Sequence, residues 1–74
     1  MNTEFKTGLS KYEHRDYHGA IVDFTKAIAI NPDASIIYEK RGRAKERLKD
    51  YQGALQDYEK AIELNPAVSE YVSR

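Results

Sequence analysis

Two histidines on either side of an aspartate are the first residues whose types and spacing could do chemistry. His14 and His18 stand four residues apart and flank Asp16. Histidines at this spacing bind zinc when both project from one face of a helix. These two lie on either side of a predicted turn between helices, so they do not share a face. We interpret them as exposed histidines near a turn and predict no metal site.

No other arrangement of residues in the sequence indicates catalysis. Cysteine is absent, which excludes thiolate nucleophiles, thiolate zinc sites and disulfide frameworks. The sequence also lacks a recognisable spacing of serine, histidine and acid, and it has no glycine-rich phosphate loop. We therefore predict that the chain is not an enzyme and uses no cofactor.

The charges of the chain balance. The 74 residues include 12 Lys and Arg and 12 Asp and Glu, which gives a formal net charge of zero. Such a chain has no long-range attraction to a phosphate backbone or an anionic membrane. We expect neither nucleic acid nor a membrane as a partner. With no signal peptide, no bilayer-length apolar run and no cysteine in the sequence, a cytoplasmic location is the default expectation.

Three cations form the most distinctive charged pattern. Lys40, Arg43 and Arg47 follow the spacing i, i+3, i+7, which places them on one face of a helix. This face could bind an acidic side chain or a terminal carboxylate of a partner. The alternative is a solvated face neutralised by neighbouring acids, as is usual for charged helices. The acids close enough to neutralise it are Glu39, Glu46 and Asp50.

The elements that must position these residues are helices. The spacing of apolar residues predicts four of them, over 3–15, 17–30, 35–48 and 52–64, and a further helix that starts near residue 67. Each start has a polar residue that can accept a backbone hydrogen bond. The candidates, in chain order, are Asn2 or Thr3, Asp16, Asp33 or Ser35, and Asp50.

The sequence repeats itself after 34 residues. The stretch from Asp16 to Pro32 returns as the stretch from Asp50 to Pro66, and residues 1–34 share 13 identical positions with residues 35–68. A fixed period of this length is typical of stacked helical repeats. The recurrence of a glycine inside the first helix of each pair, at Gly8 and Gly42, predicts a close approach of another helix.

With this period and these positions the sequence resembles the tetratricopeptide repeat family. The glycine, tyrosine, small, aromatic, small and proline positions of that family correspond to Gly8, Tyr17, Ala20, Phe24, Ala27 and Pro32 in one unit, and to Gly42, Tyr51, Ala54, Tyr58, Ala61 and Pro66 in the next.

The resemblance implies a single all-α domain, an α-α superhelix of antiparallel helix-turn-helix pairs with right-handed stacking. It divides the chain into repeat one at 1–34, repeat two at 35–68, and the start of a capping helix or third repeat at 69–74. The tyrosines at repeat positions are predicted to be core residues. They are Tyr17, Tyr38, Tyr51 and Tyr58.

The resemblance also implies a function. In this family the first helices of the repeats line a concave groove that holds a peptide of a partner protein, so we expect a protein-protein interaction module or scaffold. One alternative is a unit for self-association or structural assembly. Another is a fragment of a longer repeat protein with an accessory role. The residues expected to line the groove are Phe5, Leu9, Tyr12, Glu39, Lys40, Arg43 and Arg47.

One part of the expected groove has no obvious support within its own helix pair. Phe5, Leu9 and Tyr12 form an apolar stripe on the first helix. The sequence shows no packing partner for this stripe in the first pair, so we interpret it as available to a ligand.

Overall fold

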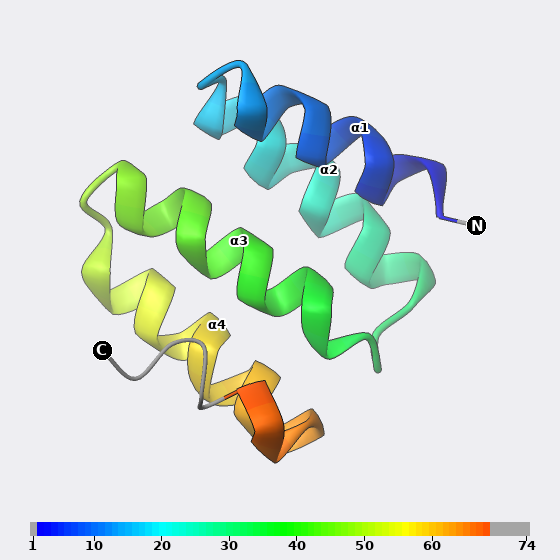
Figure 1. Cartoon of the computed structure of the whole chain (residues 1–74), viewed down its shortest axis with the longest axis vertical. Coiled ribbons are helices and arrows are strands. Elements are labelled where there is room, and N and C mark those ends of the chain that lie inside the picture. Colours follow the sequence, from blue (N-terminus) through cyan, green and yellow to red (C-terminus); the bar gives the residue numbers. More distant parts are fainter. Residues whose placement is uncertain (1, 69–74) are drawn as a thin grey trace.

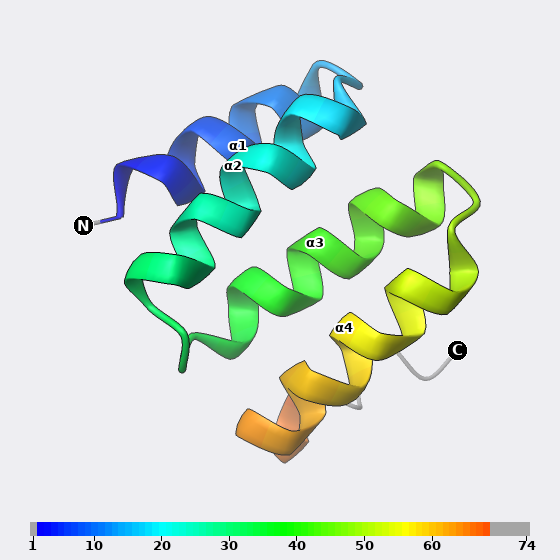
Figure 2. The ribbon, with the colours of Figure 1, turned by 180° about the vertical axis from the view of Figure 1, so that it is seen from behind.

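The chain folds into two antiparallel helical hairpins laid side by side. The computed structural model describes residues 2–68, and its secondary structure there is entirely helical. Figures 1 and 2 show the four long helices following one another as neighbours, with α3 between α2 and α4. The elements are α1 (Thr3–Glu13), α2 (Tyr17–Ile30), α3 (Ser35–Arg47), α4 (Tyr51–Leu64) and a short 3-10 helix η1 (Pro66–Val68).

The predicted all-α fold is therefore confirmed, and the helix bounds agree with the prediction to within two residues. The largest difference is at α1, which ends at Glu13 rather than at residue 15. The predicted start of a third repeat or capping helix at 69–74 lies outside the described residues.

Side-chain caps start three of the four long helices. The carboxylates of Asp16 and Asp50 accept hydrogen bonds from the amides of Gly19 and Gly53, each at 3.1 Å. The side chain of Asn2 caps α1 in the same way. Each cap satisfies a backbone amide that the helix itself leaves without a partner, and these three predictions are confirmed.

The start of α3 differs from the prediction. Its N-cap residue is Ala34, which has no side-chain oxygen, and α3 has no side-chain cap hydrogen bond. The predicted caps, Asp33 or Ser35, are therefore wrong. Asp33 lies in the turn before Ala34, and Ser35 is already the first helical residue, so neither occupies the position from which a side chain can cap.

The turns inside the two hairpins share one hydrogen-bond pattern and one backbone conformation. Asp16 N donates to Lys11 O at 2.8 Å, and Asp50 N donates to Lys45 O at 2.9 Å. This 6→1 bond closes a Schellman motif, whose central residue takes the left-handed conformation. That residue is Arg15 in one turn, with φ 66°, and Lys49 in the other, with φ 68°. A cationic side chain thus occupies a position at which glycine would cost less.

The core lies where α1, α2 and α3 meet. Ala20, Phe24 and Ala27 of α2 and Ile37 of α3 are almost fully buried. The apolar stripe of α1 packs against this cluster, with the Phe5 ring 5.8 Å from the ring of Phe24. The prediction that this stripe has no partner within the first pair is therefore wrong. Helical periodicity identified the face correctly but not the residue that covers it.

The two buried glycines lie where the helices of each hairpin approach closely. A Cβ atom placed on Gly8 would lie 2.6 Å from the ring of Phe24, and one on Gly42 would lie 2.8 Å from the ring of Tyr58. Real Cβ contacts are never this short, so only glycine fits without a shift of the ring. The predicted close approach is confirmed at both positions.

Buried carboxylates of the second helices bind lysines of the first helices. Lys11 Nζ lies 3.1 Å from Asp23 Oδ2, and Lys45 Nζ lies 3.2 Å from Asp57 Oδ2 at the equivalent place. In the second hairpin Arg41 adds a two-pronged hydrogen bond to Asp57, at 2.7 and 2.8 Å, which raises the pKa of the Arg41 guanidinium. Arg41 also donates to Thr25 of α2 at 3.2 Å, so one side chain joins the two hairpins.

The glycine contact generates the first testable prediction. Gly8→Ala forces its new methyl group into the Phe24 ring, at an overpacking cost of about 1–3 kcal/mol. The better helix propensity of alanine returns about 1 kcal/mol. We expect a net loss of about 1 kcal/mol in the free energy of unfolding, measured by urea denaturation. Ser10→Ala, at an exposed site of the same helix, serves as the control. Equal stability of the two variants would contradict the packing role.

A second prediction comes from the difference between the hairpins. Thr7 stands 34 residues before Arg41, so Asp23 lacks the guanidinium that Asp57 has. Asp23 Oδ2 is buried and has no aligned hydrogen bond in the described residues. We expect Thr7→Arg to raise the free energy of unfolding by about 1 kcal/mol.

The matched control for this variant is Thr7→Gln, which lengthens the side chain without adding charge. Denaturation curves of both variants separate the charge effect from helix propensity. If Thr7→Arg is no more stable than Thr7→Gln, Asp23 does not need a second cation.

Candidate functional site

The three predicted cations project from α3, and two of them meet at a buried carboxylate. Glu39 is 5% exposed. Its Oε2 accepts a hydrogen bond from Arg43 Nε, and its Oε1 lies 3.9 Å from Lys40 Nζ. The bond to Glu39 raises the pKa of the Arg43 guanidinium. Glu39 was expected to line the groove, but its carboxylate is below the surface and holds the two cations in place.

The third cation connects α3 to α1. Arg47 Nε donates to the hydroxyl of Tyr12 at 3.4 Å. The Tyr12 ring in turn packs edge-on against Tyr17, with ring centroids 5.3 Å apart. The guanidinium of Arg47 is thus held beside an aromatic side chain of the other hairpin, which sequence spacing alone does not predict.

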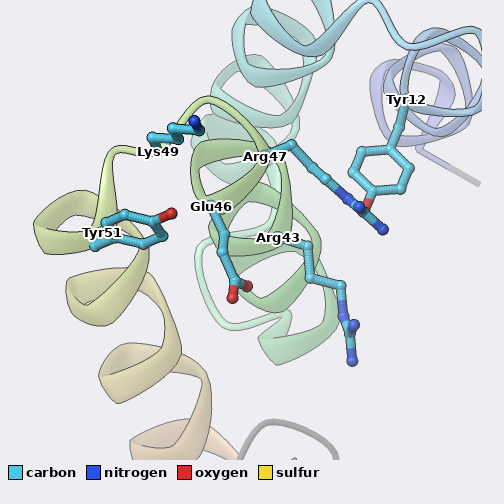
Figure 3. A pocket seen from close by; sticks show the side chains of 6 residues that line it. All are labelled: Tyr12, Arg43, Glu46, Arg47, Lys49 and Tyr51. Carbon is cyan, nitrogen blue, oxygen red and sulfur yellow. The ribbon is translucent and has the colours of Figure 1, made fainter.

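These side chains surround a surface depression of about 460 Å³. Figure 3 shows Arg47 extending toward Tyr12, with Lys49 and Tyr51 on the other side of Glu46. We call this depression the turn pocket, because the turn between α3 and α4 forms one of its sides. Its lining residues are Tyr12, Arg43, Glu46, Arg47, Lys49 and Tyr51.

Glu46, at the centre of Figure 3, accepts a hydrogen bond from a tyrosine of α4 that the figure does not draw. The Tyr58 hydroxyl donates to Glu46 Oε1 at 2.7 Å. Burial of the hydroxyl and this bond to a carboxylate both raise the pKa of Tyr58. Glu46 therefore has a partner below the pocket.

Sequence reasoning missed two residues of the turn pocket, Lys49 and Tyr51. Tyr51 was expected in the core, and this prediction is wrong, because its side chain is 61% exposed. Its counterpart Tyr17 is half-buried because Tyr12 packs on it, whereas Glu46 stands in the place of Tyr12 one period later. The presence of Glu46 at the position equivalent to Tyr12 was the sequence signal that could have indicated the exposure of Tyr51.

Comparison with known families gives a match for the second hairpin. Residues 35–67 match the family model of the tetratricopeptide repeat, and this range contains the whole of α3 and α4. The chain carries a tetratricopeptide repeat. The preceding hairpin, with the same helix order and the same glycine contact, has the architecture expected for this fold. Tetratricopeptide repeats are generally non-enzymatic modules for protein-protein interaction. A search of curated proteins gave no significant match.

A second depression lies at the N-terminal end of α3, beside the residues that follow α4. It measures about 350 Å³ and lies between α3 and η1. Lys40 and Arg43 contribute to it, so Arg43 touches both depressions. The remaining lining residues are Ser35, Ile36, Glu39, Asn65 and Val68.

Two of the expected groove residues do not line either depression. Phe5 and Leu9 are half-buried and pack on the core cluster. The structure thus brings Tyr12 of α1 together with Arg43 and Arg47 of the tetratricopeptide repeat. Phe5 and Leu9, nearer the start of α1, pack on the core instead.

The histidines lie where the sequence predicted. His14 and His18 are exposed at the α1–α2 turn, and His14 Nδ1 lies 2.7 Å from the carbonyl oxygen of Ser10. Within residues 2–68 no cluster of three metal-ligating side chains is present.

None of the helices in the described part of the chain combines the length and the apolarity that crossing a bilayer requires.

The buried glutamate of the tetratricopeptide repeat gives a third prediction. Glu39→Gln removes the charge that holds Arg43 and Lys40, while keeping the shape of the side chain. We expect the free energy of unfolding to fall by about 1.5 kcal/mol, the lower end of the range for a hydrogen bond to a charged group. Glu59→Gln, at an exposed site of α4, is the control in the same denaturation assay. A loss no greater than that of the control would show that Glu39 anchors neither cation.

Proposed function

We propose that the chain is an interaction module that holds an acidic, extended peptide segment of a partner protein against α3. One observation carries the proposal: Lys40, Arg43 and Arg47 lie along a single face of α3, and Glu39 and Tyr12 fix their positions. This face belongs to the first helix of the tetratricopeptide repeat, the helix that lines the groove in this family. In this proposal α2 and α4 are the scaffold.

The spacing of the cations defines the segment that would fit. Arg47 lies seven residues after Lys40, a rise of about 10 Å along the helix. An extended peptide advances about 3.3 Å per residue, so acidic side chains two residues apart on one side stand about 6.6 Å apart. A segment with acids at alternate positions therefore places two carboxylates within the span of the three cations. Each exposed ion pair contributes little by itself, and the affinity depends on several together.

The test is capture of an acidic peptide. Lys40→Glu combined with Arg47→Glu should abolish capture and leave the helical circular dichroism unchanged, because neither side chain is buried. Arg43 is less suitable for charge reversal, since a carboxylate there would face the buried Glu39. The control is Lys60→Glu, which reverses a charge on the exposed side of α4 that pairs with Glu63. Capture should also weaken as salt is added.

Unchanged capture in the double variant would remove α3 as the binding face. Self-association is the alternative function, and the exposure of Tyr51 and Leu55 on α4 favours it, at 61% and 56%. Sedimentation of the free protein over a range of concentrations separates the two functions. A module that binds a partner peptide stays monomeric, whereas an assembly unit gains mass as its concentration rises.

A cytoplasmic location fits a cysteine-free chain with this proposed role, because the reducing cytoplasm favours modules that need no disulfide.

A further inference from the structure

We propose that the segment formed by residues 69–74 fills the second depression through the side chain of Tyr71, and that it thereby competes with the acidic peptide for the first half of α3. The competition rests on the proposed function, whereas the filling of the depression does not. The segment itself lies outside the described residues. Its place is inferred from the internal repeat and from the path of the chain up to Val68.

The path of the chain after α4 repeats the path after α2. The amide of Asn31 donates to Ala27 O at 2.8 Å, and the amide of Ala34 donates to Asn31 O at 3.2 Å. The residues one period later form the same two bonds, at 2.8 and 2.9 Å, and these bonds bring the chain to Val68 at the end of η1 (Figure 1). Ala34 is the residue immediately before α3. We therefore expect the residues after Val68 to approach α4 as α3 approaches α2.

The repeat assigns Tyr71 to a definite place. Ile37 is the third residue of α3 and is 2% exposed. It belongs to the buried cluster with α2, on which Phe5 and Leu9 of α1 also pack. The residue 34 positions after Ile37 is Tyr71. Tyr71 is thus the side chain expected beside α3 and α4 where Ile37 lies beside α1 and α2.

The second depression corresponds to the site that holds Ile37. Three of its lining residues stand one period after residues that pack on the cluster of Ile37. The equivalent pairs are Phe5 and Glu39, Leu9 and Arg43, and Ala34 and Val68. The volume of about 350 Å³ lies at the lower end of the range for small-ligand sites, about 300–1,000 Å³. One aromatic side chain is an occupant of suitable size.

The chemistry of the two sites differs in the same sense as their occupants. Phe5 and Leu9 give the first site apolar walls, whereas Glu39 and Arg43 give the second a bonded ion pair. An isoleucine suits apolar walls. A tyrosine suits the ion pair better, because its ring can stack on a guanidinium and its hydroxyl can bond a polar neighbour.

The segment and an acidic peptide would need the same cations. Lys40 and Arg43 line the second depression, and both belong to the proposed binding face. Glu70 directly precedes Tyr71, so docking of the tyrosine brings a carboxylate beside these cations. A peptide then binds only the fraction of molecules in which the segment is displaced, and its apparent affinity falls by that fraction.

The first experiment measures whether residue 71 is shielded from solvent. The sequence contains no tryptophan, so Tyr71→Trp places a single fluorophore in the full chain. The reference is Tyr51→Trp, because the side chain of Tyr51 is 61% exposed. We expect Tyr71→Trp to emit at shorter wavelength than the reference and to be quenched several-fold less by acrylamide, at every protein concentration.

Two results of this experiment would overturn the inference. Equal quenching of the two variants would show that residue 71 does not enter the depression. Shielding that is lost on dilution would show that the occupant comes from a second copy of the chain.

The second experiment measures competition, with a peptide that carries glutamates at alternate positions. We expect Tyr71→Ala to bind it about fivefold more tightly, which corresponds to docking of the segment in about four molecules out of five. Glu70→Gln should give a smaller gain. Tyr71→Phe keeps the ring and should leave the affinity near that of the unsubstituted chain, as should the control Val72→Ala.

Equal affinity of Tyr71→Ala and the unsubstituted chain would overturn the competition. The two experiments also separate this failure from failure of the proposed function. If the peptide binds to none of the variants, α3 is not the binding face, and the tryptophan measurement, which needs no peptide, still decides whether residues 69–74 fill the depression.

Discussion

The position of α3 between two other helices is the constraint on which the rest of the structure depends. α3 packs on α2 through Ile37 and on α4 through Gly42. A helix covered on two sides has only one arc left for charged residues. Lys40, Arg43 and Arg47 share the remaining arc, whereas the other two cations of α3, Arg41 and Lys45, bind Asp57 of α4. The helix that we propose as the binding face is thus also the one that joins the two hairpins.

Charge has a structural role inside this protein as well as on its surface. Three acidic side chains, Asp23, Glu39 and Asp57, are buried, and each has a cation from a first helix beside it. Buried carboxylates are costly unless they are paired. The pairs of Asp23 with Lys11 and of Asp57 with Lys45 join the two helices of each hairpin, whereas Glu39 pairs within α3. Arg41 extends the arrangement across hairpins, because it contacts both Asp57 and Thr25. A zero net charge therefore conceals strongly ordered local charge.

Much of the fold could be predicted from the sequence because its signals are local. The caps at Asp16 and Asp50 and the glycines at 8 and 42 depend on neighbours at fixed offsets, and the 34-residue period repeats them. The missing cap of α3 could not be predicted, because it depends on which turn residue reaches the N-cap position. The partner of Phe5 likewise depends on how two helices meet, which periodicity does not encode.

The candidate site was only partly predictable for the same reason. The face containing Arg43 and Arg47 follows from spacing along one helix, and the structure bears out that they lie together. Lys49 and Tyr51 line the pocket because the α3–α4 turn and the start of α4 lie next to the end of α3. The burial of Glu39 depends on α3 being covered from two sides. Such features belong to the tertiary structure and leave no periodic trace.

The uncapped start of α3 has a consequence for motion. A first helical turn without a side-chain acceptor leaves its amides to water, and such turns fray more readily than capped ones. Here the loose turn contains Ser35 and Ile36, beside the depression next to η1, whereas the far end of α3 is closed by the bond from Asp50 to Lys45. The first turn of α3 is therefore expected to open more readily than its last turn. If α3 is the binding face proposed above, an incoming chain would meet an adaptable turn at one end and a closed one at the other.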